Sequence, residues 1–321
     1  MNKQPLLSVC IPTYGRDKIL ARTLSHLTSL PVFTQSGEWE IVLSDNASPD
    51  DTQGVGLSFA RRFPGRIRYF RNERNVLDDN FRLALSRGCG LYLKLCNDTL
   101  LLTDEGIRAM LACIREHLSD KPNLYFQNLD SEAPALMCAT MDAFVEAVGY
   151  RCTWIAEYGI WQEDFRTIDD FGRASGKMLI QVDATYRMLA RKPRTIVLRR
   201  HFFDILPKPF HGGFEPSFVF GQNYFSIQRP YADAGLITRR TLNRDKYGMF
   251  RHVILPNYLI TRPEFRYPRT DYMRNLWPEY KGRWYFYFFY PFTLLAIPVA
   301  WIRRAAWDMR LRMRAEKAII P

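Results

Sequence analysis

The sequence predicts an α/β fold with a mostly parallel sheet that helices cover on both faces. Short apolar runs alternate with amphipathic stretches through the first 130 residues, and this strand–helix alternation is typical of parallel sheets. The chain has 321 residues, of which 47% are hydrophobic and 14% aromatic. This composition excludes a disordered protein, and the length suits one large domain or a domain with an appendage.

The expected elements follow one another at short intervals. Strands are predicted where apolar runs are short, and helices where apolar residues recur every three or four positions. The strands are expected at Leu6–Pro12, Glu40–Ser44, Arg66–Phe70, Leu91–Leu95 and Leu124–Gln127. The helices are expected at Asp17–Leu30, Thr52–Arg62 and Leu77–Ser86, from Thr103 to about Leu118, and at Met178–Ala190.

Three polar segments each follow one of the predicted strands. They are Thr13–Arg16, Asp45–Asp50 and Cys96–Thr99. Open parallel sheets bind ligands beyond the carboxyl ends of their strands. We therefore expect the three segments to meet at one edge of the sheet and to form the site.

Charge and cysteine content narrow the class of protein further. The net charge is +12, but residues 1–150 carry −2 and residues 151–321 carry +14. Nucleic acid, an anionic membrane and a phosphorylated substrate are the candidate partners of a basic rear half. The six cysteines form no C-x-x-C pair, which argues against a disulfide framework or a zinc site and favours a reducing compartment.

The chain is expected to divide into three regions: 1–130, 131–238 and a basic C-terminal region, 239–321. Within the last, residues 284–302 carry no charge; Lys281 and Arg283 precede them, and Arg303 and Arg304 follow. This length permits a membrane span, while two prolines and many aromatic residues fit an interfacial segment equally well. A core helix of a soluble domain is the remaining alternative. We favour contact of residues 281–317 with an anionic membrane surface.

Four motifs occur in a fixed order: LSVCIPTYGR, EIVLSDNASPDDT, NERNVLDDNFRLAL and LYLKLCNDTLLL. Together they resemble family 2 glycosyltransferases of the GT-A fold, over about residues 6–130 and more loosely to 200. The resemblance is strongest to enzymes that build bacterial surface polysaccharides, such as abequosyltransferase-like proteins. It implies transfer of a sugar from a nucleotide-sugar to an acceptor hydroxyl with inversion.

The resemblance implies a set of donor-binding residues. In the family, the loop after the first strand lines the nucleoside pocket, and Asp45 accepts a hydrogen bond from the base or ribose, although an Asx-turn would use Asp45 differently. The helix after the third strand lies beside the nucleotide and its diphosphate. The expected donor-binding residues are Pro12, Thr13, Tyr14, Arg16, Asp45, Arg71, Asn75, Asn80 and Asn97.

The implied metal site departs from the family pattern. Relatives carry Asp-x-Asp after the fourth strand, and this chain has Cys96 in place of the first aspartate while Asp98 keeps the second. One carboxylate with phosphate oxygens and water is a normal arrangement for magnesium. We therefore expect Asp98 to hold Mg²⁺ or Mn²⁺, and Cys96 to be a small buried residue.

Inverting transfer also needs a general base for the acceptor proton. The candidates are Glu163, Asp164, Asp169, Asp170 and Asp183. Asp183 comes first because it lies in an apolar run without charged neighbours in the sequence. Asp164 comes second because its Glu-Asp pair resembles one found in relatives.

These features predict a glycosyltransferase of bacterial surface polysaccharide synthesis, such as O-antigen or capsule. Its expected acceptor is a lipid-linked oligosaccharide, and its expected location is the cytoplasmic face of the inner membrane. The alternative is a catalytically silent scaffold or saccharide-binding protein of the same fold, which the missing first aspartate favours. Charge alone suggests a nucleic-acid partner, and no motif supports one, so none is expected.

Overall fold

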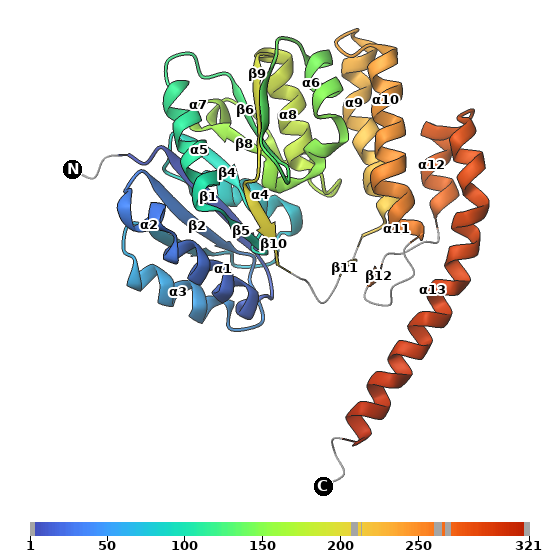
Figure 1. Cartoon of the computed structure of the whole chain (residues 1–321), viewed down its shortest axis with the longest axis horizontal. Helices are drawn as coiled ribbons and strands as arrows, with labels where there is room; N and C mark the ends of the chain where they lie inside the picture. Colours follow the sequence, from blue (N-terminus) through green and yellow to red (C-terminus); the bar gives the residue numbers. More distant parts are fainter. Residues whose placement is uncertain (1–3, 207–210, 213, 260–264, 267–270, 318–321) are drawn as a thin grey trace. The chain divides into compact units, whose positions relative to one another are not determined.

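The structure of the chain is a computed structural model that describes residues 4–206, 211–212, 214–259, 265–266 and 271–317. The chain divides into two units. Unit 1 comprises Met1–Pro207 with Tyr231–Thr238, and unit 2 comprises Lys208–Pro230 with Arg239–Pro321. Figure 1 follows the chain from the strands of unit 1 to the orange and red helices of unit 2.

The main sheet of unit 1 has five strands in the order β3-β2-β1-β4-β8. The first four run parallel, and β8 pairs antiparallel with β4 at the edge. Their bounds are β1 Leu7–Thr13, β2 Trp39–Asp45, β3 Ile67–Arg71, β4 Tyr92–Leu95 and β8 Gly159–Trp161. The register places Thr13 opposite Asp45 and Asp45 opposite Arg71, so the ends of three strands line up along one edge.

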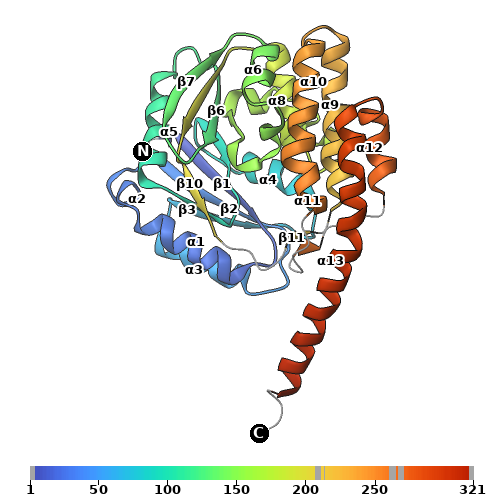
Figure 2. The ribbon, with the colours of Figure 1, turned by 45° about the vertical axis from the view of Figure 1, so that its right-hand side comes forward.

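Helices cover both faces of this sheet, because the strands carry apolar residues on both sides. On one face Val9 and Ile11 pack with helices α1, α2 and α5, and on the other Cys10 and Leu95 pack with α4 and α8. Figure 2 shows α1 and α3 along one side of β1–β3. The helices are α1 Asp17–Ser29, α2 Pro31–Gln35, α3 Thr52–Arg62, α4 Asn80–Ser86, α5 Asp104–Glu116 and α8 Ile180–Arg191. This architecture confirms the predicted α/β fold.

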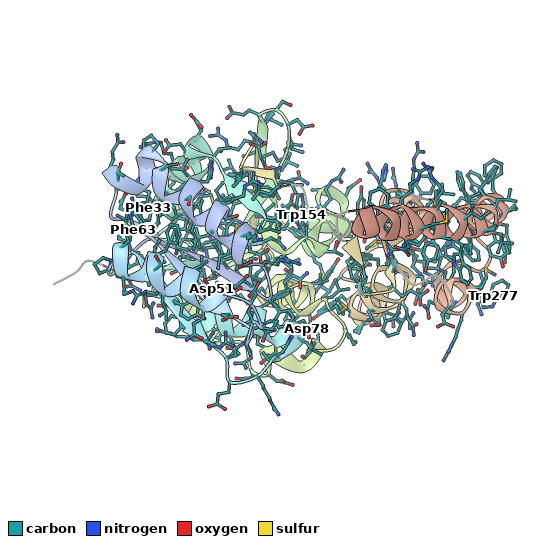
Figure 3. All side chains as sticks on the ribbon, turned by 90° about the horizontal axis from the view of Figure 1, so that it is seen from below. Phe33, Asp51, Phe63, Asp78, Trp154 and Trp277 are labelled. Carbon is teal, nitrogen blue, oxygen red and sulfur yellow. The ribbon has the colours of Figure 1, made fainter. Side chains whose placement is uncertain are left out.

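Aromatic residues close the outer end of the first face. Phe33 and Phe63, labelled in Figure 3, meet edge to face with ring centroids 5.2 Å apart. Trp39 packs on Phe33 in the same way at 5.3 Å. Such pairs stabilise beyond the apolar area that they bury, and they fix α2 and the end of α3 against the start of β2.

A second sheet of unit 1 corrects one sequence prediction. The expected fifth strand, Leu124–Gln127, forms as β6 (Asn123–Asn128) but pairs with β9 (Thr195–Arg200) and not with the parallel strands. β7 (Ala133–Cys138) completes this sheet antiparallel to β9, and β5 (Leu100–Leu102) forms a separate pair with β10 (Phe203–Ile205). The reason is that β8 takes the position beside β4.

Short elements connect these parts of unit 1. The 3-10 turns are η1 Leu77–Asp79, η2 Gly149–Thr153, η3 Ile155–Glu157 and η4 Phe171–Ala174. The remaining helices are α6 Met141–Ala147 and α7 Gln162–Arg166.

Unit 2 is mostly helical and has an aromatic core. Phe250 contacts Tyr280 and Tyr285 with ring centroids 5.4 and 5.3 Å apart. Its strands are the short pair β11 His211–Gly212 and β12 Phe265–Arg266. Its helices are η5 Ser217–Asn223, α9 Tyr224–Asp233 (of which the residues from Tyr231 on belong to unit 1), α10 Arg239–Met249, η6 Phe250–Ile254, α11 Leu255–Leu259, α12 Tyr272–Tyr280 and α13 Trp284–Lys317. The apolar segment 284–302 is the first part of α13, and Trp284–Arg310 is long and apolar enough to cross a membrane by length and composition.

Candidate active site

The three polar segments meet at the carboxyl edge of the parallel strands, as predicted. The backbone N–H of Gly15 donates to Ser48 Oγ at 2.9 Å, and the backbone N–H of Asn46 donates to the carbonyl of Thr13 at 3.0 Å. Thr13 Oγ1 donates to Asp98 Oδ2 at 2.8 Å, although 85 residues separate them. The parallel strands therefore bring the three loops into one cluster.

Asp98 is the buried carboxylate at the centre of this cluster. Its Oδ2 accepts the Thr13 hydroxyl, its Oδ1 lies 2.7 Å from Nη1 of Arg16, and its backbone carbonyl accepts Thr23 Oγ1 at 2.7 Å. A buried charge needs such compensation. Arg16 supplies it from the N-cap position of α1.

The neighbours of Asp98 define which ligands this site can supply. Burial raises the pKa of Cys96 to about 12, so its thiol stays protonated at neutral pH and does not act as a thiolate ligand. Asn97 Oδ1 is buried and has no hydrogen-bond donor among the residues that the structure describes. A carboxylate and an unsatisfied carbonyl oxygen are hard donors, which fit Mg²⁺ or Mn²⁺. Within the same residues there is no cluster of three or more His, Cys, Asp and Glu side chains.

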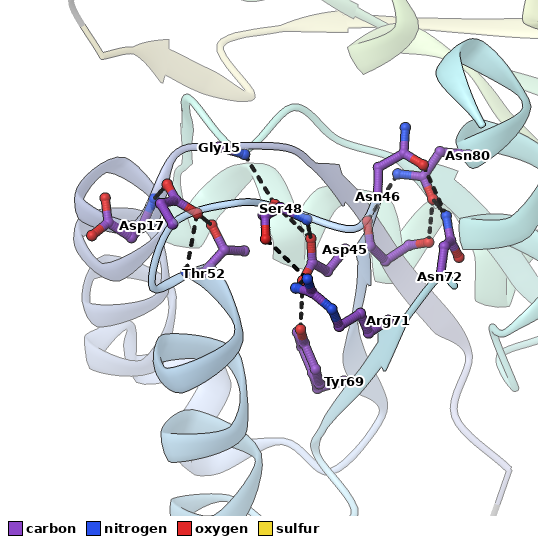
Figure 4. Close-up of polar contacts among 12 residues, drawn as sticks. Gly15, Asp17, Asp45, Asn46, Ser48, Thr52, Tyr69, Arg71, Asn72 and Asn80 are labelled. Carbon is purple, nitrogen blue, oxygen red and sulfur yellow. Dashed lines mark hydrogen bonds and ion pairs between the residues drawn. The ribbon is translucent and has the colours of Figure 1, made fainter. Parts of the chain in front are cut away.

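Asp45 is fully buried, and both of its oxygens are occupied (Figure 4). Oδ1 accepts the amide of Ser48 at 2.9 Å and its hydroxyl at 2.5 Å, whereas Oδ2 accepts Tyr69 Oη and Arg71 Nη1, each at 2.6 Å. Oδ1 of Asp45 thus closes a turn with Ser48, but it does not cap the next helix, which begins at Thr52 with Asp51 as its N-cap. Arg71 is part-exposed, so its guanidinium is the group of this arrangement that solvent reaches. Contact of Asp45 with a nucleotide stays a prediction and would require one internal donor to be replaced.

Asn80 and Asn75 lie in an amide network beside this turn. Asn80 accepts from Ser44 Oγ at 2.6 Å and from Asn72 at 3.0 Å, and its amide donates to the Ser44 carbonyl. Asn46 joins Asn75 at 2.8 Å, and Figure 4 shows Asn46, Asn72 and Asn80 together. Asn80 is buried and its polar atoms are used internally, so it shapes the loop. The expected donor contacts of both residues stay predictions.

Two arginines from different elements surround Asp183. Arg173 binds it in a fork, with distances of 2.8 Å from Nε to Oδ2 and 2.6 Å from Nη2 to Oδ1, and Arg187 approaches to 3.7 Å. Asp183 has no charged neighbours in the sequence, but in the folded chain η4 and the next turn of α8 each supply one. Its role as a base stays a prediction.

Asp164 lies at the wrong edge of the sheet for the predicted role. β8 runs antiparallel to β4, with Gly159 opposite Lys94 and Trp161 opposite Tyr92. The chain therefore leaves β8 at the amino edge, where Asp164 pairs with Lys192 at 2.5 Å. This direction of β8 argues against Asp164 as the base, and its role stays a prediction.

The other three carboxylates on the candidate list have no described link to Asp98. Glu163, which also follows β8, pairs with Lys121 at 2.5 Å. Asp169 and Asp170 are exposed, and their backbone carbonyls accept hydrogen bonds from Arg187.

Sequence reasoning missed Asp78, which is labelled in Figure 3. This buried carboxylate accepts the amides of Gly176 and Met178, both at 3.1 Å, and Ser175 Oγ at 3.2 Å. It ties η1, beside the Asn75 loop, to the loop that leads into α8 and Asp183. The contact spans about 100 residues, so no local pattern signals it.

A second missed feature is a pair of buried ionisable side chains, Lys94 and Glu157, between the main sheet and the β6-β9-β7 sheet of unit 1. Lys94 on β4 donates to the carbonyl of Ala156, and Glu157 accepts Tyr125 Oη at 2.7 Å. Burial lowers the pKa of Lys94 to about 8 and raises that of Glu157 to about 6. A lysine inside a central strand is the one signal that the sequence offered.

The fold and the polar edge define an α/β protein whose polar loops gather at the carboxyl ends of its parallel strands. Residues 8–120 match the model of the family "Glycosyl transferase family 2". This confirms the resemblance that the four motifs indicate, for the part of the chain that carries them.

Individual relatives agree with this match. The chain is 42% identical over 89 residues to validoxylamine A glucosyltransferase of Streptomyces hygroscopicus subsp. limoneus, covering 28% of this chain and 18% of that protein. It is 31% identical over 122 residues to abequosyltransferase RfbV of Salmonella typhimurium, covering 37% and 34%. The matches thus span only about a fifth to a third of these relatives.

Solved structures support the GT-A fold over more of the chain. TarS 1–349 of S. aureus in complex with UDP-GlcNAc has a TM-score of 0.53 at 14% identity, covering 84% of this chain and 79% of that one. The mannosyltransferase PcManGT of Pyrobaculum calidifontis, in complex with GDP-Man and Mn²⁺, has a TM-score of 0.52 at 12% identity, covering 95% and 88%.

Proposed function

We propose that the chain transfers a sugar from a nucleotide-sugar to an acceptor hydroxyl with inversion. The observation that carries this proposal is the convergence of Asp98, Arg16 and Arg71 at the carboxyl edge of a domain that matches glycosyl transferase family 2. Two part-exposed guanidinium groups at one edge suit a diphosphate, because arginine recognises phosphate in a bidentate manner.

In this reaction the acceptor oxygen forms a bond to the anomeric carbon while the bond from that carbon to the diphosphate breaks. The electron pair leaves with the diphosphate, and the acceptor proton passes to a carboxylate. Arg16 and Arg71 stabilise the leaving charge. Asp183 is the candidate base, and Arg173 and Arg187 hold its carboxylate in a fixed orientation.

Asp98 and Asn97 would hold the divalent cation. Mg²⁺ or Mn²⁺ bound there supplies Lewis-acid stabilisation of the leaving diphosphate. Thr13 orients the Asp98 carboxylate from the side opposite to Arg16, because the two bind different oxygens.

The test is release of nucleoside diphosphate from a panel of UDP- and GDP-sugars with Mg²⁺ or Mn²⁺. One donor is expected to be turned over by the wild-type chain, and Asp98→Asn is expected to lose at least about 100-fold of that rate. Asp130→Asn, an exposed aspartate at a distance along the chain, is the matched control. Turnover by Asp98→Asn at the control rate would contradict the assignment of the site.

A catalytically silent saccharide-binding protein is the second candidate. Cys96 in place of a carboxylate favours it, because the site then has one anionic ligand. The same panel separates the two functions: a silent protein would bind a nucleotide-sugar or saccharide and release no nucleoside diphosphate from any donor.

The acceptor that we propose is a lipid-linked oligosaccharide of bacterial surface polysaccharide synthesis, at the cytoplasmic face of the inner membrane. The support comes from α13 of unit 2. One face of this helix is exposed and apolar, at helical spacing: Phe288, Phe292, Leu295, Val299 and Ile302. Arginines follow at 303, 304, 310, 312 and 314, which suits anionic lipid headgroups.

α13 lies along the membrane surface in this proposal and does not cross the bilayer. Its first turns pack against α10 and η6, with Tyr285 on Tyr247 at 5.0 Å and Arg283 bound to Asn243 at 2.5 Å. α10 has the sequence RRTLNRDKYGM. If α13 crossed the bilayer, lipid tails would surround its first turns and remove water from the charged side chains of α10. This desolvation would cost free energy.

Vesicle flotation tests this placement. The chain is expected to float with vesicles that contain an anionic lipid and to be released by alkaline carbonate. Leu295→Glu with Ile302→Glu should abolish flotation, whereas Met137→Glu, at an equally exposed apolar residue of β7, should not. Resistance to carbonate would show a spanning helix and contradict the proposal.

A further inference from the structure

Arg16 occupies the oxygen of Asp98 that faces away from Thr13. The Arg16 Nη1 to Asp98 Oδ1 distance is 2.7 Å, and Thr13 holds Oδ2 at 2.8 Å. Both carboxylate oxygens are therefore engaged within the chain. A divalent cation that binds Asp98 directly therefore competes with Arg16 or Thr13 for the space and the lone pairs at one oxygen.

Of the two residues that bind the Asp98 carboxylate, Arg16 is the one whose side chain can move away from it. Its side chain is 42% exposed while that of Asp98 is 1% exposed, and Asp98 is the one side-chain partner described for it. Arg16 stands at the end of a loop before α1, next to Gly15 with φ of +62°. Asp98, in contrast, is fixed at its backbone by Thr23 and at its carboxylate by Thr13.

The single negative charge of Asp98 also opposes its binding of Arg16 and a divalent cation at the same time. Asp98 is the one acidic residue of the segment 96–99. One negative charge cannot compensate a guanidinium and a divalent cation held side by side.

We infer that Arg16 is a latch on the metal site: its guanidinium and the divalent cation are alternative partners of Asp98, and the released guanidinium turns to the donor diphosphate. This inference rests on the proposed function, since it concerns the same site. It follows that cation and nucleoside diphosphate bind cooperatively, because the diphosphate gives Arg16 a new partner when the cation displaces it.

Direct titration with Mn²⁺, followed by the electron paramagnetic resonance signal of the free ion, tests the latch without any turnover. Arg16→Gln is expected to bind Mn²⁺ about tenfold more tightly than wild type, since it removes one charge-assisted hydrogen bond that the ion must break. Arg22→Gln removes the same charge from an exposed position of α1 and is expected to leave the affinity within about twofold. Asp98→Asn is expected to lose stoichiometric Mn²⁺ binding.

A second measurement uses the same titration in the presence of UDP or GDP. Either nucleotide that binds is expected to raise the Mn²⁺ affinity of wild type more than that of Arg16→Gln. Arg16→Lys, which keeps the charge but loses the planar fork, should fall between the two and serves if Arg16→Gln does not fold.

The outcomes separate the latch from the proposed function. If Arg16→Gln binds Mn²⁺ as Arg22→Gln does, or more weakly, the latch is wrong, while turnover of a nucleotide-sugar would still support the transferase. If Asp98→Asn binds Mn²⁺ as wild type does, Asp98 is not the ligand and the latch also fails. Absence of donor turnover beside tight Mn²⁺ binding by Arg16→Gln supports the latch and contradicts the transferase.

Discussion

At the scale of single residues, three buried aspartates of unit 1 share one arrangement. Asp98, Asp45 and Asp183 each pair with an arginine, and the carboxylates are at most 7% exposed whereas the arginine side chains are 34–47% exposed. An incoming anion therefore meets guanidinium groups, and the carboxylates act from behind them. The exposed groups of these pairs are thus positively charged, although the aspartates of the sequence motifs are negatively charged.

The ion pair between Asp45 and Arg71 predicts that substitution of Asp45 lowers the stability of the fold. Asp45→Asn removes the charge that holds Arg71 and replaces an acceptor of four hydrogen bonds by an amide, so we expect the free energy of unfolding to fall by about 3 kcal/mol. Urea unfolding measures this change. Asp130→Asn, at an exposed loop position, is expected to stay within about 0.5 kcal/mol of wild type.

Glu157 predicts a pH dependence of stability. Burial raises its pKa from the ordinary 4.5 to about 6, so between these values the folded chain holds the proton more tightly than the unfolded chain does. Stability should therefore fall as the pH rises from about 4.5 to about 6.

Glu157→Gln lacks this titration, and the difference in unfolding free energy between wild type and variant should shift in favour of the variant across that window. Thermal unfolding at pH 4.5, 5.2 and 6 checks the difference, with Glu132→Gln as the control at an exposed position. A constant difference across the window would contradict the role of Glu157.

At the scale of elements, Asp78 joins two parts of unit 1 that are far apart in the sequence. Asp78→Ala would leave the amides of Gly176 and Met178 and the Ser175 hydroxyl without their acceptor. We expect hydrogen exchange of residues 175–180 to accelerate by at least about tenfold.

The neighbouring Asp79 provides the control, because its side chain binds only Arg82 among the contacts described. Asp79→Ala should leave exchange at 175–180 unchanged. Equal acceleration in both variants would mean that general loosening of η1, and not the loss of the Asp78 contact, causes the effect.

Patterns among neighbouring residues predicted where the strands and helices lie, but they predicted less well how the strands pair in sheets. The expected strand Leu6–Pro12 is β1 at Leu7–Thr13, and Thr103 caps α5 by accepting the Gly106 amide at 3.0 Å. These features depend on neighbouring residues alone. The direction of β8 and the pairing of β6 with β9 depend on contacts between distant segments, and no pattern within either strand specifies them.

The same limit applies to the site. Motif order indicated that Thr13, Asp45 and Asp98 belong together, because parallel strands end at one edge. The arginines that pair with the aspartates could not be assigned, since Arg16, Arg71 and Arg173 reach their partners only in the folded chain. The position of Asp164 could not be predicted for the same reason, because the antiparallel direction of β8 places it at the other edge of the sheet.

At the scale of the whole molecule, the uneven charge follows the division into units. The excess of basic residues lies in the second half of the chain, where unit 2 carries α10 and α13. Unit 1 holds the polar edge that would act on the nucleotide-sugar, and unit 2 holds the apolar and basic helix that would face the membrane. Leu295→Glu with Ile302→Glu, at exposed positions of α13, is accordingly expected to abolish vesicle flotation while donor turnover in solution persists. Parallel assays of the variant and the wild-type chain, with circular dichroism as a check on folding, measure both effects.

The central claim is that the carboxyl edge around Asp98 receives the donor diphosphate. A crystal structure of the chain with Mn²⁺ and the nucleoside diphosphate of its preferred donor tests it most directly. We predict the ion on Asp98, the diphosphate between Arg16 and Arg71, and the Arg16–Asp98 ion pair broken. A nucleotide bound elsewhere, or bound while Arg16 still pairs with Asp98 and no ion is present, would contradict it.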